Sequence, residues 1–180
     1  MGTVPSISFS HAGIFVMDLA LMESFYTRVL GLTVTDRGRL GERDLVFTSA
    51  DPTEHHQLVL ATGRPADLSF NMVNQISFRA DSLATLLALY QRIQNEAVSE
   101  IDPASHGNAL SVYFRDPEGN RVEVFIDTPW YVDQPMKIPM DLRRTEAEIW
   151  RWAEETASKL PGFRPRDQWE DEMRRRMGRA

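Results

Sequence analysis

The chain has 180 residues, of which 42% are hydrophobic, and its formal net charge is −6 at pH 7. This size suits one compact domain or a domain with an added tail, and the apolar content is enough for a folded core. The negative charge argues against nucleic-acid binding, which needs clustered Lys and Arg, and no apolar run reaches the ~20 residues of a membrane span.

The opening segment and the cysteine count bear on the compartment and on metal chemistry. The segment MGTVPSISFSHAG lacks the basic flank and the apolar centre of a signal peptide. The chain contains no cysteine, which excludes disulfides and thiolate metal sites. We therefore expect a cytoplasmic protein in which any metal is held by His, carboxylate or amide oxygen.

An internal repeat at an offset of 64 residues organises most of the chain. The segment HAGIFVMDLALMESFYTR, from His11, aligns without a gap with QISFRADSLATLLALYQR, from Gln75. Each copy reads as a short strand, an acidic residue and a helix. Chance similarity of two amphipathic helices is the alternative, but four identities favour a duplication: Leu19 with Leu83, Ala20 with Ala84, Tyr26 with Tyr90 and Arg28 with Arg92.

Three strand-like segments follow each predicted helix. They cover residues 32–38, 44–50 and 55–61 in the first copy, and residues 98–102, 109–115 and 121–127 in the second. A turn containing Asp-Pro joins the last two strands of each copy, at Asp51-Pro52 and at Asp116-Pro117. Each copy is therefore predicted to have the order β-α-β-β-β.

A single sheet of this kind would leave one apolar face bare, so two modules must pack together. The sequence therefore predicts an α+β fold of two paired βαβββ modules that share one pocket. The first module covers about residues 7–62 and the second about 72–127, within a domain spanning 1–127.

A C-terminal extension, residues 128–180, follows this domain. It begins as a Pro-rich irregular segment, and residues 145–160 then have the pattern of an amphipathic helix, with Thr145 and Glu148 as a capping box. A charged segment, residues 165–179, predicts another short helix. We interpret the extension as a packing or dimerisation element, and a lid over the pocket is the alternative.

The repeat also places polar side chains at equivalent positions. His11 opens the first strand of the first module, and Gln75 holds the same place in the second. Aligning the two Asp-Pro turns pairs Leu58 with Glu123. His56 lies two residues before Leu58 and, by strand alternation, points to the same face.

Each of these residues has an ordinary explanation when taken singly, since most histidines near strand ends are surface or satisfied residues. A duplicated fold, however, would bring the positions together. Glu123 lies between two valines in an apolar strand, so it needs a partner if it points inward. A metal ion would be one such partner.

The run from His106 to Glu123, HGNALSVYFRDPEGNRVE, resembles the ring-cleavage motif of type I extradiol dioxygenases, which belong to the vicinal oxygen chelate superfamily. Ala104 departs from the usual motif. The resemblance covers about residues 7–127, and the chain's size is similar to that of one-domain dioxygenases acting on biphenyl-2,3-diol-type catechols. The motif positions are met by His106, Val112, Tyr113, Asp116, Pro117, Gly119 and Glu123.

The resemblance implies roles for individual residues. His11 resembles the first metal ligand and Glu123 the carboxylate ligand, while Gln75 stands where the family has its second ligand histidine. His56 resembles the histidine that acts as acid and base beside the metal. Tyr113 resembles the tyrosine that hydrogen-bonds the substrate oxygen.

The same resemblance implies the reaction and its partners. His106 is expected to line the substrate pocket. Two imidazoles and one carboxylate on one face of Fe(II) leave three coordination positions, enough for the two oxygens of a catechol and for O2. The implied partners are a small aromatic substrate and O2, with pairing of chains into a homodimer or higher homo-oligomer.

Gln75 departs from the family pattern, because an amide oxygen is a neutral and weaker donor than imidazole. Three interpretations follow. In the first, a His-Gln-Glu site still holds Fe(II) or Mn(II) and the protein cleaves catechols. In the second, the protein is a non-redox metalloenzyme with Mn(II), Ni(II) or Zn(II), since related glyoxalases use Gln and Glu as ligands. In the third, it is a metal-free binding protein. Tyr113 and His56 favour the dioxygenase, with Fe(II) as its cofactor.

Overall fold

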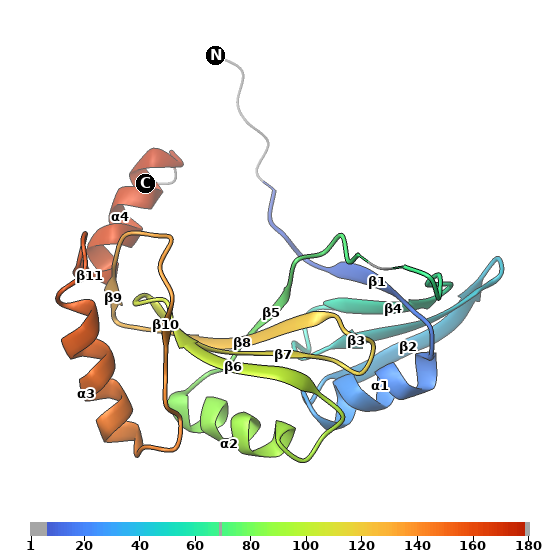
Figure 1. Ribbon diagram of the computed structural model, residues 1–180. Coiled ribbons are helices and arrows are strands. Elements are labelled where there is room, and N and C mark those ends of the chain that lie inside the picture. Colours follow the sequence, from blue (N-terminus) through green and yellow to red (C-terminus); the bar gives the residue numbers. More distant parts are fainter. Residues whose placement is uncertain (1–6, 69, 179–180) are drawn as a thin grey trace. The chain divides into compact units, whose positions relative to one another are not determined.

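The computed structural model describes residues 7–68 and 70–178, and the chain divides into two compact units, Met1–Met72 and Val73–Ala180 (Figure 1). No helix in these described ranges is long and apolar enough to cross a membrane. Both units contain mixed sheets and helices, so the predicted α+β class is confirmed.

The first unit has the predicted order β-α-β-β-β. Its four-stranded sheet runs β1-β4-β3-β2, with β1 parallel to β4 and the other pairs antiparallel. Asp18 caps α1 by accepting a hydrogen bond from the amide of Leu21 at 2.9 Å, and α1 packs on β3 and β4. The elements are β1 (Ala12–Val16), α1 (Leu19–Arg28), β2 (Thr33–Leu40), β3 (Arg43–Ser49) and β4 (Leu58–Thr62).

The second unit repeats this order and adds one edge strand. Its sheet runs β10-β6-β7-β8-β5, and α2 covers one face of it by packing on β7 and β8 (Figure 1). Ser82 caps α2 through a hydrogen bond from the amide of Thr85. The elements are β5 (Ile76–Arg79), α2 (Leu83–Ile93), β6 (Ser99–Ser105), β7 (Ala109–Arg115), β8 (Arg121–Asp127) and β10 (Ile138–Pro139).

The strand register corrects one sequence alignment. Ala12 lies opposite Leu58 on β4, whereas the repeat partner of Ala12, Ile76, lies opposite Val122 on β8. Leu58 therefore corresponds to Val122, and Glu123 corresponds to Val59. The pairing of Leu58 with Glu123 was wrong by one residue because the β3–β4 connection is longer than the β7–β8 turn, so the Asp-Pro turns do not mark equivalent positions.

This shift also changes the face that Leu58 occupies. Leu58 is only 1% exposed and belongs to the core under α1. His56 instead packs its ring against Phe47, whose register partner is Val59, on the opposite face of the sheet. His56 and Leu58 thus do not share a face, because His56 lies before the start of β4, where strict alternation does not hold.

The C-terminal extension packs within the second unit. Strand β10 pairs with β6. One face of α3 is buried, and it carries Ile149, Ala153 and Ala157. Thr145 and Glu148 form the predicted capping box. The remaining elements are β9 (Trp130–Tyr131), which pairs with β11 (Arg164–Pro165), and the helices α3 (Glu146–Ala157) and α4 (Arg166–Arg176).

Candidate active site

One face of the β7–β8 hairpin forms the floor of a pocket in the second unit. Cross-strand pairs place Tyr113 opposite Glu123 and Ala109 opposite Asp127. Alternation turns these side chains away from α2, because the intervening residues of β8 are core valines and an isoleucine. The pocket has a volume of about 290 Å³ and is lined by Gln75, His106, Asn108, Ala109, Tyr113, Glu123, Phe125, Asp127, Trp130, Tyr131, Gln134, Arg166 and Trp169.

Glu123 is a buried carboxylate, 7% exposed, that is held by neutral hydrogen-bond donors. Its Oε2 accepts from Ser77 Oγ at 2.6 Å and from Gln75 Nε2 at 2.8 Å, while its Oε1 accepts from Ser111 Oγ at 2.8 Å. These donors offset much of the cost of burying the carboxylate. They leave its full negative charge in the pocket, which suits a cation.

The residues around Glu123 fit a divalent metal that prefers oxygen ligands. Gln75 and Glu123 are in direct contact, and together they offer amide and carboxylate oxygens. Such oxygens suit hard divalent cations, Mn(II) among them. Among the described residues, no three His, Cys, Asp or Glu side chains gather into a metal-binding cluster.

Tyr113 and His106 form a hydrogen-bonded pair beside this carboxylate. The Nδ1 of His106 lies 2.7 Å from the Met136 carbonyl oxygen, and its Nε2 lies 2.8 Å from the Tyr113 hydroxyl. A carbonyl can only accept, so in the neutral imidazole Nδ1 carries the proton and Nε2 accepts from Tyr113. Gln134 Nε2 also donates to the His106 carbonyl at 2.7 Å, so the extension holds both the backbone and the ring of His106.

The surroundings of Tyr113 keep its hydroxyl protonated. Burial raises the pKa of Tyr113 well above its ordinary value, and the neighbouring charge of Glu123 raises it further. The Arg121 guanidinium, 4.3 Å from the ring centre, lowers the pKa of Tyr113, but by less than burial and Glu123 raise it. The Lys137 ammonium lies 5.2 Å from the ring centre. Tyr113 is therefore a hydrogen-bond donor at neutral pH.

In the first unit, three histidines gather at the starts of β1 and β4. The rings of His11 and His56 lie 4.1 Å apart between centroids, and the Nδ1 atoms of His55 and His56 lie 2.8 Å apart. Burial lowers the pKa of His56, and the neighbouring His11 and His55 lower it further. Sequence reasoning missed His55, although its position next to His56 was a signal.

The predicted site residues therefore come together in two groups. His11 lies beside His56 in the first unit, and Gln75 lies beside Glu123 in the second, where Tyr113 lies opposite Glu123 on the neighbouring strand. His106 lines the pocket of the second unit. The joint metal set of His11, Gln75 and Glu123 draws on both units and stays a prediction.

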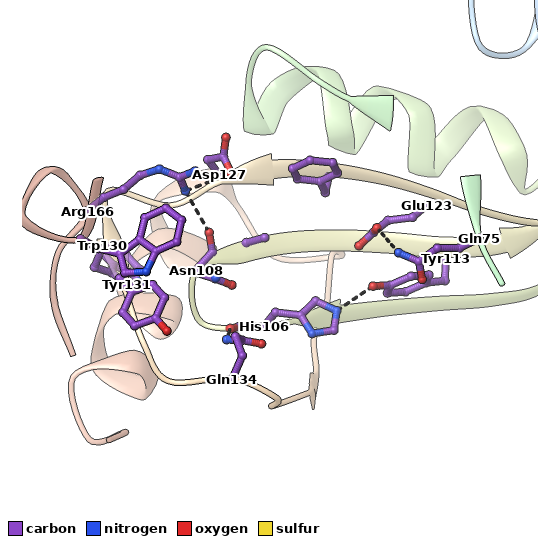
Figure 2. Close-up of a pocket in the computed structure, with 13 residues that line it drawn as sticks. Gln75, His106, Asn108, Tyr113, Glu123, Asp127, Trp130, Tyr131, Gln134 and Arg166 are labelled. Carbon is purple, nitrogen blue, oxygen red and sulfur yellow. Dashed lines mark hydrogen bonds and ion pairs between the residues drawn. The ribbon is translucent and has the colours of Figure 1, made fainter. Parts of the chain in front are cut away.

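Five pocket residues come from the C-terminal extension, and sequence reasoning missed all of them. Figure 2 shows Gln75, Tyr113 and Glu123 at one end of the pocket, Trp130, Tyr131 and Arg166 at the other, and His106 between them. Two sequence features could have indicated these pocket residues: the aromatic residues of the Pro-rich segment and the single Trp of the last charged helix. The complete set from the extension is Trp130, Tyr131, Gln134, Arg166 and Trp169.

Comparison with known proteins identifies the family. Residues 8–124 match the model of the Glyoxalase/Bleomycin resistance protein/Dioxygenase superfamily. The chain therefore belongs to this superfamily, the vicinal oxygen chelate proteins. The C-terminal extension lies outside the matched residues.

Two curated relatives are dioxygenases of Rhodococcus globerulus. Biphenyl-2,3-diol 1,2-dioxygenase 2 is 29% identical over 124 residues, which cover 66% of this chain and 62% of the relative. Biphenyl-2,3-diol 1,2-dioxygenase 3 is 29% identical over 114 residues, which cover 61% of this chain and 57% of the relative. The chain thus matches less than two thirds of the length of either enzyme.

Solved structures share the fold at lower identity. A glyoxylase/bleomycin resistance protein/dioxygenase domain from Frankia sp. EAN1pec has a TM-score of 0.58 at 21% identity and covers 70% of this chain and 100% of its own. The fosfomycin resistance protein FosX of Listeria monocytogenes, complexed with Mn(II), has a TM-score of 0.54 at 18% identity, with coverages of 70% and 95%. Glyoxalase I of Leishmania major has a TM-score of 0.55 at 23% identity, with coverages of 67% and 87%.

Proposed function

We propose that this protein is a metal-dependent extradiol dioxygenase that opens the ring of a catechol-type aromatic diol with O2. The observation that carries the proposal is the arrangement of Tyr113, His106 and Glu123 around one pocket. In the ring-cleavage motif that the chain resembles, Tyr113 and His106 correspond to residues at the substrate and Glu123 corresponds to a metal ligand. The two dioxygenase relatives support the same reaction class.

In this proposal, His11, Gln75 and Glu123 hold the metal, with Fe(II) as the expected ion. The metal would supply coordination positions for the two diol oxygens and for O2, and electron transfer between them. Glu123 suits this role because its carboxylate is already oriented by three hydrogen bonds.

The chain's own polar residues would bind and orient the diol. Tyr113 keeps its proton, which it donates to His106 in the structure, and would turn this hydrogen bond to a substrate oxygen on which negative charge develops. His56 would accept a diol proton on its imidazole and return it later in the reaction. Phe125 would bind the apolar part of the ring.

Oxygen consumption tests this proposal directly. The full chain is loaded with Fe(II) under nitrogen, mixed with a panel of catechols and exposed to air, and we expect O2 uptake and yellow ring-fission products. Tyr113→Phe should slow turnover by about 100-fold or more while leaving bound iron unchanged. Stoichiometric iron without O2 uptake for any diol would overturn the proposal.

A second candidate function is a non-redox metalloenzyme, such as an isomerase, lyase or hydrolase, acting on a small chelating substrate. Gln75 favours it, because an amide beside a carboxylate offers Mn(II), Ni(II) or Zn(II) an oxygen-rich site. Metal analysis of protein purified without chelators separates the candidates: iron supports the dioxygenase, another divalent metal supports the second function, and no metal supports a binding protein.

Substitution of Gln75→His sharpens this test. An imidazole binds Fe(II) more firmly than an amide, so we expect higher iron retention and retained ring cleavage if the protein is a dioxygenase. Gln75→Ala serves as the control, since it removes the donor without adding another. If Gln75→His abolishes an activity that the natural chain has with a different metal, the non-redox function is supported instead.

A further inference from the structure

The floor of the pocket extends well beyond the diol-binding end. Glu123, Phe125 and Asp127 alternate along the same face of β8 and all line the pocket. Asp127 lies four residue steps after Glu123, which corresponds to roughly 13 Å along the strand. A diol whose oxygens lie near Glu123 therefore leaves the far part of the floor for another part of the substrate.

The far end is closed by aromatic side chains of the extension. Tyr131, on β9, and Trp169, on α4, stack with ring centres 5.2 Å apart and planes inclined by 9°. The Arg164 guanidinium lies 4.6 Å from the Tyr131 ring centre. These contacts hold both rings in place, so this wall is formed before any ligand binds.

The charges at the far end are balanced within the protein. Asp127 pairs with Arg166 at 2.9 Å and with Arg79 at 3.1 Å, and Arg166 also pairs with Glu170 at 3.1 Å. An anionic group would compete with two carboxylates for Arg166, and a cationic group would compete with two arginines for Asp127. An uncharged group meets neither penalty.

We propose that Tyr131 and Trp169 form a specificity-determining subsite that binds a flat, uncharged group carried by the aromatic diol. This inference rests on the proposed function for the diol-binding end of the pocket. It assigns substrate selection to the C-terminal extension, which lies outside the residues that match the family.

Calorimetric titration of the full chain under nitrogen tests the subsite without turnover. The three probes are catechol, 4-phenylcatechol, which carries a second flat ring away from the diol, and 4-(4-carboxyphenyl)catechol, which adds a carboxylate at the far end of that ring. We expect the natural chain to bind 4-phenylcatechol about tenfold more tightly than catechol, and to show no such gain for 4-(4-carboxyphenyl)catechol.

Two variants and a matched control locate the effect. Trp169→Leu and Tyr131→Leu should each remove most of the preference for 4-phenylcatechol while changing catechol binding by less than about twofold. Trp152→Leu makes the same chemical change on α3, away from the residues that line the described pocket, and should keep the preference. Trp169→Phe retains an aromatic ring and should therefore keep part of the preference for 4-phenylcatechol.

The outcomes test the binding subsite separately from the proposed ring-cleavage reaction. If the natural chain shows no preference for 4-phenylcatechol, or if either Trp169→Leu or Tyr131→Leu retains it, the subsite is overturned even when rings are cleaved. If the preference is lost in both variants but retained in Trp152→Leu, the subsite stands even when no O2 is consumed.

Discussion

The two units share one order of elements but differ in what they place on the sheet face away from the helix. The first unit gathers three histidines at the strand starts, where His11 lies beside His56. The second unit buries one carboxylate, Glu123, which accepts hydrogen bonds from Gln75, Ser77 and Ser111. The equivalent of Glu123 in the first unit is Val59. The core has thus kept its pattern while the functional face has diverged.

This difference shows which constraints a repeat preserves. Most helix-facing positions of both units are apolar, since each unit must bury one face of its sheet, and the buried Thr48 is a polar exception. Positions on the other face carry no such requirement, so imidazoles, a carboxylate or a valine can occupy them. Four predictions test this contrast, from the largest expected effect to the smallest.

The first prediction concerns the shared core. Met22 and Leu86 occupy equivalent positions on α1 and α2, and both are fully buried. Met22→Ala and Leu86→Ala should each lower the free energy of unfolding by about 3 kcal/mol, because each leaves a cavity under its helix. Urea denaturation measures both, and a difference beyond about 2 kcal/mol would show that the two cores are not equivalent.

The second prediction concerns the diverged face. Glu123→Leu removes the acceptor of three hydrogen bonds and leaves Ser77, Ser111 and Gln75 without it, so we expect a loss of about 2 kcal/mol in the free energy of unfolding. Val59→Leu, the equivalent change in the first unit, should cost less than about 1 kcal/mol. Equal losses would contradict the assigned role of Glu123.

The third prediction compares the two Asp-Pro turns. Asp116 is 3% exposed and accepts hydrogen bonds from the amides of Glu118 and Asn120 and from the Asn120 side chain. Asp116→Ala should therefore destabilise the chain by about 2 kcal/mol. Asp51→Ala should destabilise the chain less than Asp116→Ala does, because Asp51 caps the turn through the single residue Thr53. Thermal unfolding of both variants checks the order.

The smallest effect is a pH dependence in the first turn. Hydrogen bonds from the Thr53 hydroxyl and amide lower the pKa of Asp51 below its ordinary value of 3.8. A lowered carboxyl pKa stabilises the fold above the ordinary pKa, and this contribution is lost as pH falls through the folded pKa, here below about pH 4. Thr53→Val should raise the pKa of Asp51 in a carboxyl NMR titration, whereas an unchanged pKa would exclude this cause.

Much of the fold could be predicted from local patterns. Strand alternation and helical periodicity located the βαβββ order in both copies, and the Thr145 capping box marked the start of α3. The sequence alignment paired Glu123 with Leu58, however, and this pairing was wrong. Strand register depends on the lengths of both connections, and the longer β3–β4 connection shifts the match to Val59.

The candidate site was predicted only in part. The motif selected Tyr113, His106 and Glu123, which the pocket brings together. It did not indicate that Ser77 and Ser111 would hold the carboxylate, because serines in strands are common and carry no spacing signal. It also gave no sign that the extension would orient His106, which depends on a main-chain carbonyl at Met136.

The sequence by itself determined the duplication, the order of elements and the polar residues able to carry chemistry, since these follow from periodicities within short segments. Only the tertiary structure decided that Gln75 would donate to Glu123, 48 residues away, and that Tyr131 and Trp169 would close the far end of the same pocket. Such contacts join segments that are distant in the chain. They depend on connection lengths and packing, and no local pattern encodes them.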